Sequence, residues 1–280
     1  MQSRLLLLAA AFLWSTAGVA MKLCQLSGWQ IAGGRSLVAG LFLFVAVRDA
    51  RRRPNGAVLA TAAGYAATVT LFALANKLTT AANAIFIQST APLWVLLLSP
   101  WLLGERPSRA ELSTIPIYGV GLVCFFLDEL SPGQMLGNWL ALAAGLAFAT
   151  CIVGLRHVQE RGPSALVYGN WLAALATAPL WLVEPTPALA DLLVLLYLGV
   201  FQLGLAYLCF ARGVAHTPAL EASLLVLLEP VLNPIWTFLI AGERPGRWAL
   251  VGGSIVLLAT LWRTLSPLWE RRAKGPAPLS

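Results

Sequence analysis

Four residues, Gly-Glu-Arg-Pro, occur twice in this chain, at 104–107 and at 242–245. Each copy ends a long apolar segment that carries a proline twelve residues upstream, Pro92 or Pro230. The equal spacing indicates that the chain is a duplication. Each copy contains five apolar segments long enough to cross a bilayer, and an odd number of crossings forces the second copy to insert upside down. The sequence therefore predicts two inverted repeats.

The composition explains why these segments belong in lipid. Hydrophobic residues make up 59% of the chain and charged residues 11%, whereas about a quarter of the residues in a soluble domain are charged. A membrane helix needs about 20 mostly apolar residues. We therefore predict an all-α integral membrane protein, with five transmembrane helices in residues 1–136 and five in residues 137–280. The ten spans are expected near residues 4–22, 30–47, 57–76, 80–102, 111–128, 137–155, 163–183, 190–210, 218–240 and 247–265.

The basic residues predict the orientation of these spans. Short cytoplasmic loops collect Lys and Arg. With a cytoplasmic N-terminus, most of these residues fall on the cytoplasmic side, among them the cluster between Arg48 and Arg53. We therefore expect both termini in the cytoplasm. The same bias accounts for most of the net charge of +7, so we expect no nucleic-acid partner. The absence of a targeting extension favours a bacterial inner membrane.

Motifs of enzymes and metal sites are absent from the sequence. His-Glu-x-x-His and Gly-x-Ser-x-Gly do not occur, and only two histidines are present. The four cysteines, Cys24, Cys124, Cys151 and Cys209, lie far apart without the spacing of a metal or redox site. We therefore expect no catalytic residue, no metal and no cofactor.

Glu229 is the polar residue that the sequence places deepest in the membrane. If its helix begins at Pro218, a rise of 1.5 Å per residue puts Glu229 about 17 Å deep, near the bilayer centre. Ionisable residues at such depth usually face a cavity or a partner. Two roles stay open: a neutral carboxyl group that ties two helices together, and a group that exchanges a proton during function. Asn233, one turn further on, is expected on the same face. Two contacts stay open for its side chain: the carboxyl group of Glu229, and backbone groups that the prolines leave without helical partners.

Pro92 and Pro230 are expected to bend their helices. A proline inside a helix removes one backbone hydrogen bond, so the carbonyl groups of Gln88 and Val226 lose their normal partners. The side chain of Gln88 lies on the same face as the bend. Broken or kinked helices at matching positions of two halves point to a binding site in membrane proteins, although a static kink filled by packing stays open. We interpret Pro92 and Pro230 as candidate hinges.

Several further residues fall near the middle of predicted spans, where they have access to a central cavity. Together with the polar groups beside the two bends they form the candidate cavity, which comprises Trp14, Tyr65, Gln88, Phe148, Gln202, Glu229 and Asn233. Helix packing and contact with lipid are the alternatives for the aromatic members. Most other tryptophans lie near span ends, as expected for aromatic belts.

Two charged residues near span ends receive structural interpretations. Arg35 lies about five residues into its span, close enough for its side chain to reach the interface. Glu221 follows Thr217 and Pro218 in the first turn of its helix, where the helix dipole favours an acidic group. Glu221 is not expected to contact a ligand, whereas a substrate role for Arg35 stays open as the less favoured alternative.

These features together resemble the drug/metabolite transporter superfamily in its EamA-type ten-helix branch. The resemblance rests on two five-helix halves, the segments Ser-Thr-Ala-Pro at 89–92 and Leu-Leu-Glu-Pro at 227–230, and the paired Gly-Glu-Arg-Pro endings. It covers essentially the whole chain. It implies a basket of helices around a central substrate cavity lined mainly by spans one, three, four, six, eight and nine, with spans five and ten peripheral. Glu229 and Pro230 match the family's Glu-Pro pair, and stabilisation of helix ends and loops is implied for Gly104, Glu105, Gly242 and Glu243.

The resemblance also implies export of amino acids, other metabolites or drugs. Phosphorylated substrates need basic residues in the cavity, and Arg35 is the one basic residue that lies in the interior of a predicted span, away from its ends. An apolar, aromatic cavity suits an amino acid with an aromatic or large neutral side chain, and the chain is similar to bacterial aromatic amino-acid exporters. Multidrug efflux, facilitated diffusion and a non-transporting membrane scaffold stay open. The expected partners are a small-molecule substrate and the lipid bilayer, in a monomer or weak homo-oligomer that works by alternating access.

Overall fold

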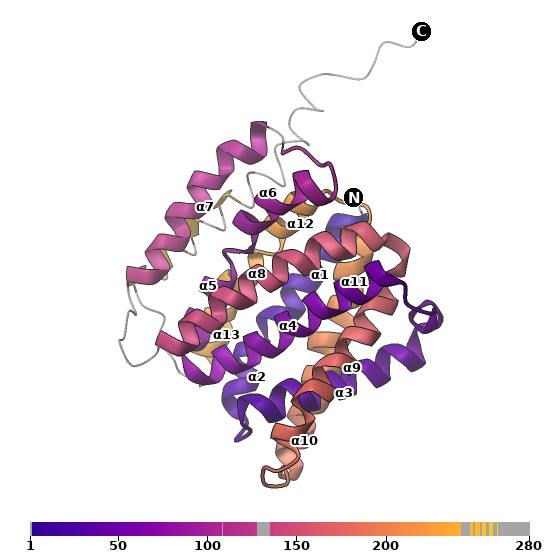
Figure 1. The fold of residues 1–280 in the computed structure, drawn as a ribbon. Helices are drawn as coiled ribbons and strands as arrows, with labels where there is room; N and C mark the ends of the chain where they lie inside the picture. Colours follow the sequence, from indigo (N-terminus) through magenta and orange to yellow (C-terminus); the bar gives the residue numbers. More distant parts are fainter. Residues whose placement is uncertain are drawn as a thin grey trace.

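The computed structural model describes residues 2–107, 109–127 and 135–241, and short stretches between residues 247 and 262. Every regular element in these residues is helical (Figure 1). Up to residue 127 the elements are α1 (Gln2–Ser15), α2 (Ala17–Leu23), α3 (Gly28–Ala46), η1 (Arg48–Arg51), α4 (Gly56–Leu78), α5 (Ala81–Gln88), α6 (Ala91–Leu102) and α7 (Arg109–Leu127). From residue 135 they are α8 (Met135–Val158), η3 (Gln159–Arg161), α9 (Gly162–Trp181), α10 (Leu189–Tyr197), η4 (Leu198–Leu205), α11 (Ala206–Val214), α12 (Ala219–Leu225), α13 (Leu228–Trp236) and η5 (Thr237–Ala241).

Seven helical stretches in the described residues are long and apolar enough to cross a membrane. One of them, Met135–Trp181, has 47 residues, about twice the length of one crossing. Its two long helices, α8 and α9, coincide with the predicted spans 137–155 and 163–183 and are separated by η3. Only short, separate stretches of the tenth predicted span, 247–265, are described, so ten spans and inverted repeats stay predictions.

Helix α4 runs through the middle of the bundle and packs against α8 and α9 (Figure 1). Small residues let these helices approach closely. A Cβ atom added at Gly154 of α8 would lie 2.6 Å from Oγ1 of Thr61, and one added at Gly169 of α9 would lie 2.6 Å from the Tyr65 ring. By contrast, α7 lies at the outer edge of the bundle, beside α5 (Figure 1).

Two helices are interrupted at matching places near the candidate hinges. The first break, at residues 89–90, separates α5 from α6, and the second, at residues 226–227, separates α12 from α13. Each proline lies in the first turn after its break, where a missing backbone N–H costs little. A third break, at Thr16 between α1 and α2, has no proline and was not expected from the sequence.

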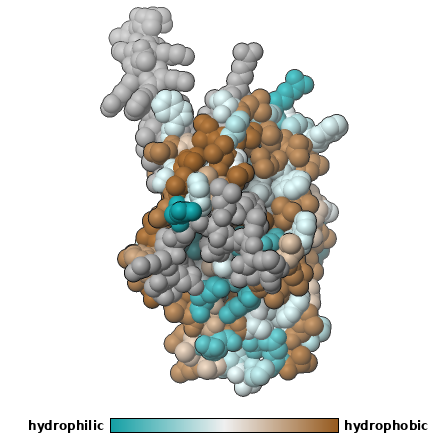
Figure 2. Space-filling view, turned by 90° about the vertical axis from the view of Figure 1, so that its left-hand side faces the viewer, coloured by the Kyte–Doolittle hydropathy of each residue, from teal (hydrophilic) through white to brown (hydrophobic). Residues whose placement is uncertain are grey.

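The outer surface is strongly apolar. Trp101 is 90% exposed and Val183 is 82% exposed, and many leucines lie on the surface as well. Figure 2 shows hydrophobic residues over much of one face, with hydrophilic residues in separate patches. Exposed apolar area of this extent would make a water-soluble protein aggregate. It is the surface expected of a multi-pass membrane protein, whose outer side chains contact lipid.

Candidate functional site

A small cavity lies inside the helix bundle. It is lined by residues from both ends of the chain, namely Trp14, Arg35, Thr68, Val69, Phe72, Gln88, Phe148, Gln202, Leu203, Tyr207 and Glu229. The centre of a water molecule has about 20 Å³ available in it, which is room for about one water. The helices must therefore move apart before a larger molecule can enter.

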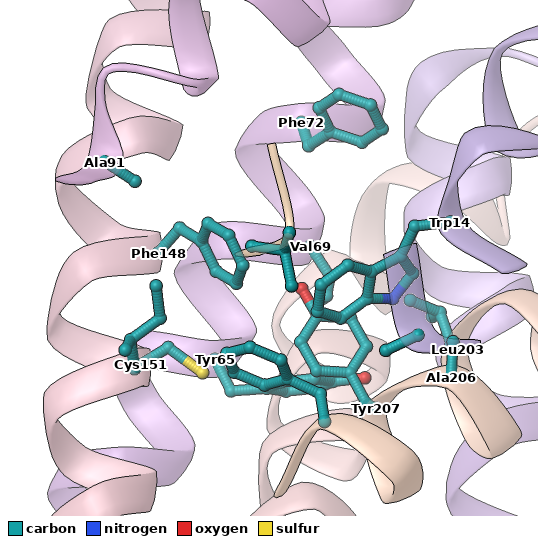
Figure 3. Packing of buried hydrophobic residues seen from close by; sticks show 14 of the residues in the cluster. Trp14, Tyr65, Val69, Phe72, Ala91, Phe148, Cys151, Leu203, Ala206 and Tyr207 are labelled. Atoms are coloured by element: carbon teal, nitrogen blue, oxygen red, sulfur yellow. The ribbon is translucent and has the colours of Figure 1, made fainter. Parts of the chain in front are cut away.

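Aromatic rings form most of the apolar wall of this cavity (Figure 3). The ring of Trp14 lies 4.6 Å from the ring of Tyr207 and 5.6 Å from the ring of Phe148, measured between centroids. The Trp14–Phe148 pair is edge-to-face, an arrangement that aromatic rings favour. These three residues come from α1, α11 and α8, so the wall joins helices distant in sequence.

Five of the seven candidate cavity residues lie together in this lining: Trp14, Gln88, Phe148, Gln202 and Glu229. Tyr65 lies one layer further out, with its ring edge-to-face on Tyr207 at 4.6 Å (Figure 3). Its hydroxyl group donates a hydrogen bond to Oδ1 of Asn170 at 3.1 Å. Tyr65 therefore supports the wall from behind.

Asn233 lies away from the cavity and does not pair with Glu229 in the way that the helical spacing suggested. Its Nδ2 donates a hydrogen bond to the backbone carbonyl of Ser15 at 2.8 Å. The indole of Trp236, one turn later, donates to Oγ of the same serine at 2.9 Å. The break after Ser15 gives α13 polar groups to bind, and these contacts turn Asn233 toward α1.

Glu229 lies in the first turn of α13, directly after the second break. Its backbone N–H donates to the carbonyl of Val226 at 3.0 Å, so this carbonyl, expected to lack a partner, has one. The carboxyl group is half-buried and lines the cavity. Within the described part of the chain it forms neither a hydrogen bond nor an ion pair. Gln88, the last residue of α5, is likewise half-buried in the lining.

Arg35 corrects an expectation, because its side chain points into the bundle and does not reach the interface. It is 1% exposed and lines the cavity. One terminal nitrogen donates to Oε1 of Gln202 at 3.1 Å and the other donates to the carbonyl of Val69 at 2.6 Å. These acceptors hold the guanidinium inside. The signal available in the sequence was that Arg35 is the one basic residue in the interior of a predicted span, away from its ends.

A wide helical turn in the eighth predicted span was not expected from the sequence. Residues Leu198–Leu205 form a π-helix between α10 and α11. Such segments are rare and occur frequently at functional sites. This one contributes Gln202 and Leu203 to the cavity, and Tyr207 follows it in α11. The sequence did not identify Tyr207, because it lies near the end of the predicted span 190–210 and candidates were chosen near span centres.

A second group of charges lies at the bundle end that holds the N-terminus. Gly104 ends the helical segment of α6 with a φ of +68°, a conformation that glycine adopts without strain. This turn presents Glu105, whose carboxylate accepts from Nε of Arg156 at 2.7 Å and from the backbone N–H of Ala219 at 2.9 Å. Glu105 therefore connects the end of α6 with α8 and with the start of α12. The matching residues Gly242 and Glu243 lie outside the described residues.

Glu221 is also held by a charge at this end of the bundle. Its carboxylate pairs with Arg4 at 2.5 Å, and it occupies the first turn of α12. This geometry agrees with its structural interpretation, because an acidic group is favourable near a helix N-terminus.

The model of the EamA-like transporter family matches this chain twice, over residues 2–127 and over residues 135–265. A solved crystal structure shares the fold, with a TM-score of 0.74, 20% sequence identity and coverage of 94% of this chain and 97% of the other.

Three relatives illustrate the range of similar proteins. The uncharacterized transporter YwfM of Bacillus subtilis is 27% identical over 97% of this chain and 96% of its own length. The probable terminal-alkyne amino-acid exporter of Streptantibioticus cattleyicolor is 25% identical over 92% of each chain. The threonine/homoserine exporter RhtA of Escherichia coli is 24% identical over 73% of this chain and 69% of its own.

Proposed function

The chain belongs to the EamA-like transporter family of the drug/metabolite transporter superfamily, and from this premise we propose that it exports amino acids with aromatic or large neutral side chains. Membrane transport follows from the family. The choice of substrate rests on the cavity, in which the aromatic wall of Trp14, Phe148 and Tyr207 stands beside polar groups. Ligand sites commonly combine apolar walls with a few well-placed polar groups in this way.

The names of two relatives support an amino acid as the substrate. One is named a threonine/homoserine exporter and the other a probable terminal-alkyne amino-acid exporter. The first name also favours a second candidate, a small hydroxylated amino acid such as threonine. The aromatic lining of the cavity supports the first candidate.

The proposed mechanism is alternating access, with two five-helix halves moving against each other around the cavity. The two family matches, 2–127 and 135–265, support halves close to 1–136 and 137–280. The breaks at residues 89–90 and 226–227 lie next to cavity residues Gln88 and Glu229, so rotation there would move polar groups in the lining. Pro92 and Pro230 are the proposed hinges.

The bacterial inner membrane, with both termini cytoplasmic, is the proposed location. Basic residues support this orientation, because Arg48, Arg51 and Arg161 all lie at the bundle end that holds the N-terminus. In that orientation the Glu105 contacts lie on the cytoplasmic side. A cysteine-accessibility experiment on residues placed at each end would test it.

Counterflow in proteoliposomes tests the proposed function. Vesicles are preloaded with unlabelled tryptophan or unlabelled threonine, and a trace of the same labelled amino acid is added outside. Accumulation of tryptophan that phenylalanine and tyrosine block supports the first candidate. Accumulation of threonine alone supports the second. If folded protein accumulates neither amino acid, amino-acid export is wrong for this chain.

A further inference from the structure

The cavity contains two side chains that can carry opposite charges and that do not pair with each other. Arg35 and Glu229 both line it. The ion pairs among the described residues join Arg4 with Glu221, Arg52 with Asp49, Arg156 with Glu105 and His216 with Glu160. Charges inside a membrane protein are costly unless they have partners. A direct pair would lower that cost, so stability does not explain why these two groups stand apart.

The contacts of Arg35 orient its guanidinium without neutralising it. Both acceptors, Oε1 of Gln202 and the carbonyl of Val69, are uncharged. The buried Nε has no acceptor in the described structure. A guanidinium has five N–H donors in a planar fork, so donors remain for a ligand. A carboxylate is the group that this fork binds best, through two parallel hydrogen bonds.

Glu229 offers the complementary charge from another helix. Its backbone N–H is bonded to Val226, which fixes the start of α13, while its carboxyl group remains half-buried against the cavity. An ammonium group is a suitable partner, because it has three donors and no acceptor. The aromatic wall of Trp14, Phe148 and Tyr207 lines the same space.

We propose that Arg35 binds the α-carboxylate of the transported molecule and that Glu229 binds its α-ammonium group, so that the cavity selects free zwitterionic amino acids. Gln202 is a positioning residue, because it acts on the substrate through Arg35. This inference rests on the proposed function. It adds that both charged ends are required, which excludes amidated amino acids, carboxylates without an amine, and simple lipophilic cations as good substrates.

Competition binding to the purified full-length protein tests this directly. Labelled L-tryptophan and labelled L-threonine are bound in parallel experiments, and the competitors are the matching amino acid, its amide and its deamino analogue. For tryptophan these analogues are tryptophanamide and indole-3-propionate. Losing a hydrogen bond to a charged group weakens binding by roughly tenfold to a hundredfold. Each analogue should therefore compete at least about tenfold less well than the amino acid.

Two variants assign the two ends of the substrate. In Arg35→Gln, the advantage of tryptophan over tryptophanamide should disappear while its advantage over indole-3-propionate persists. In Glu229→Gln, the opposite pattern is expected. Lys77→Gln and Glu221→Gln are matched controls, because Lys77 donates to the carbonyl of Cys24 and Glu221 pairs with Arg4, both outside the cavity lining. The controls should keep both preferences.

The outcomes separate this inference from the function on which it rests. If wild-type protein performs counterflow but binds the amides or deamino analogues as well as the amino acids, zwitterion selection is wrong and export stands. Unchanged preferences in Arg35→Gln or Glu229→Gln overturn the assignment of that residue. If Arg35→Gln does not fold, Arg35→Lys replaces it, because this variant retains the charge but loses the planar fork. Arg35→Lys should weaken binding of the amino acid more than binding of its amide. Absence of counterflow for both amino acids overturns the function and the inference together.

Discussion

Glu105 and Glu229 are both acidic residues near a helix end, but the protein treats them differently. The carboxylate of Glu105 is fully engaged, with Arg156 at 2.7 Å and the backbone N–H of Ala219 at 2.9 Å. Glu229 shares a cavity with Arg35, and its carboxyl group pairs with neither Arg35 nor any other group in the described structure. The chain therefore uses charge to join helices at the bundle end and leaves charge available in the cavity.

This difference separates stability from function. Glu105 and Arg156 are about a quarter exposed, so their contact is partly screened by solvent and stabilises the fold moderately. An unpaired ionisable group inside the bundle opposes folding. Proteins keep such groups where activity requires them, at some loss of stability. Removing Glu229 should therefore damage transport and spare the fold, whereas removing Glu105 should do the reverse.

The largest effect is expected for Glu229→Gln. Transport should fall by roughly tenfold to a hundredfold, because the amide cannot replace a charged partner of the substrate. The melting temperature should stay the same or rise, since no contact of the carboxyl group is lost. Counterflow and thermal unfolding in detergent measure the two effects, with Glu221→Gln as the control. A large drop in melting temperature would mean that Glu229 ties helices together.

A pH gradient distinguishes the two functional roles of Glu229. If this residue exchanges a proton during transport, uptake by the wild-type protein should increase with an imposed gradient, and Glu229→Gln should lose that increase. The variant would then retain only gradient-independent exchange. Equal stimulation of both proteins by the gradient would rule out proton coupling through this residue.

The two broken helices allow a comparison within the cavity. In Pro92→Ala and Pro230→Ala the helices can close across their breaks, because alanine restores the missing donor and favours helix. The exchange rate should fall severalfold while the dissociation constant of the substrate changes less, because hinge residues act on the conformational step. Counterflow rate and equilibrium binding separate these quantities. Equal losses of rate and affinity, or no loss, argue against hinges.

The sequence predicted the features that depend on local spacing. The repeated motif and the prolines identified the two breaks, and mid-span depth identified Trp14, Phe148 and Glu229, which line the cavity. It could not give the direction of Arg35, because that direction depends on acceptors in α4 and η4, distant in sequence. It could not give the partner of Asn233 for a similar reason, because the carbonyl group that accepts from Asn233 belongs to Ser15, at the other end of the chain. The π-helix at Leu198–Leu205 and the place of Tyr207 in the lining had no signal in local spacing, because Tyr207 lies near the end of its predicted span.

Glu105→Ala tests the contribution of the Glu105 contacts to stability. It removes two hydrogen bonds to a carboxylate at a partly exposed site, so the free energy of unfolding should fall by about 2 kcal/mol. Counterflow by the remaining folded protein should persist, because Glu105 does not line the cavity. Arg106→Gln is the matched control, since Arg106 is its exposed neighbour and belongs to none of the ion pairs in the described residues. Complete loss of exchange in stable Glu105→Ala protein would assign these contacts to the transport cycle.

Tyr65→Phe is expected to have the smallest effect and marks where the cavity wall ends. The substitution keeps the ring that packs on Tyr207 and removes the hydroxyl that donates to Asn170. The free energy of unfolding should fall by about 1 kcal/mol, the net contribution of one hydrogen bond. The concentration of tryptophan that gives half-maximal exchange should change little, because Tyr65 stands behind the lining. A shift in that concentration as large as the one caused by Glu229→Gln would mean that the substrate reaches Tyr65. The cavity wall seen in this structure would then move during transport.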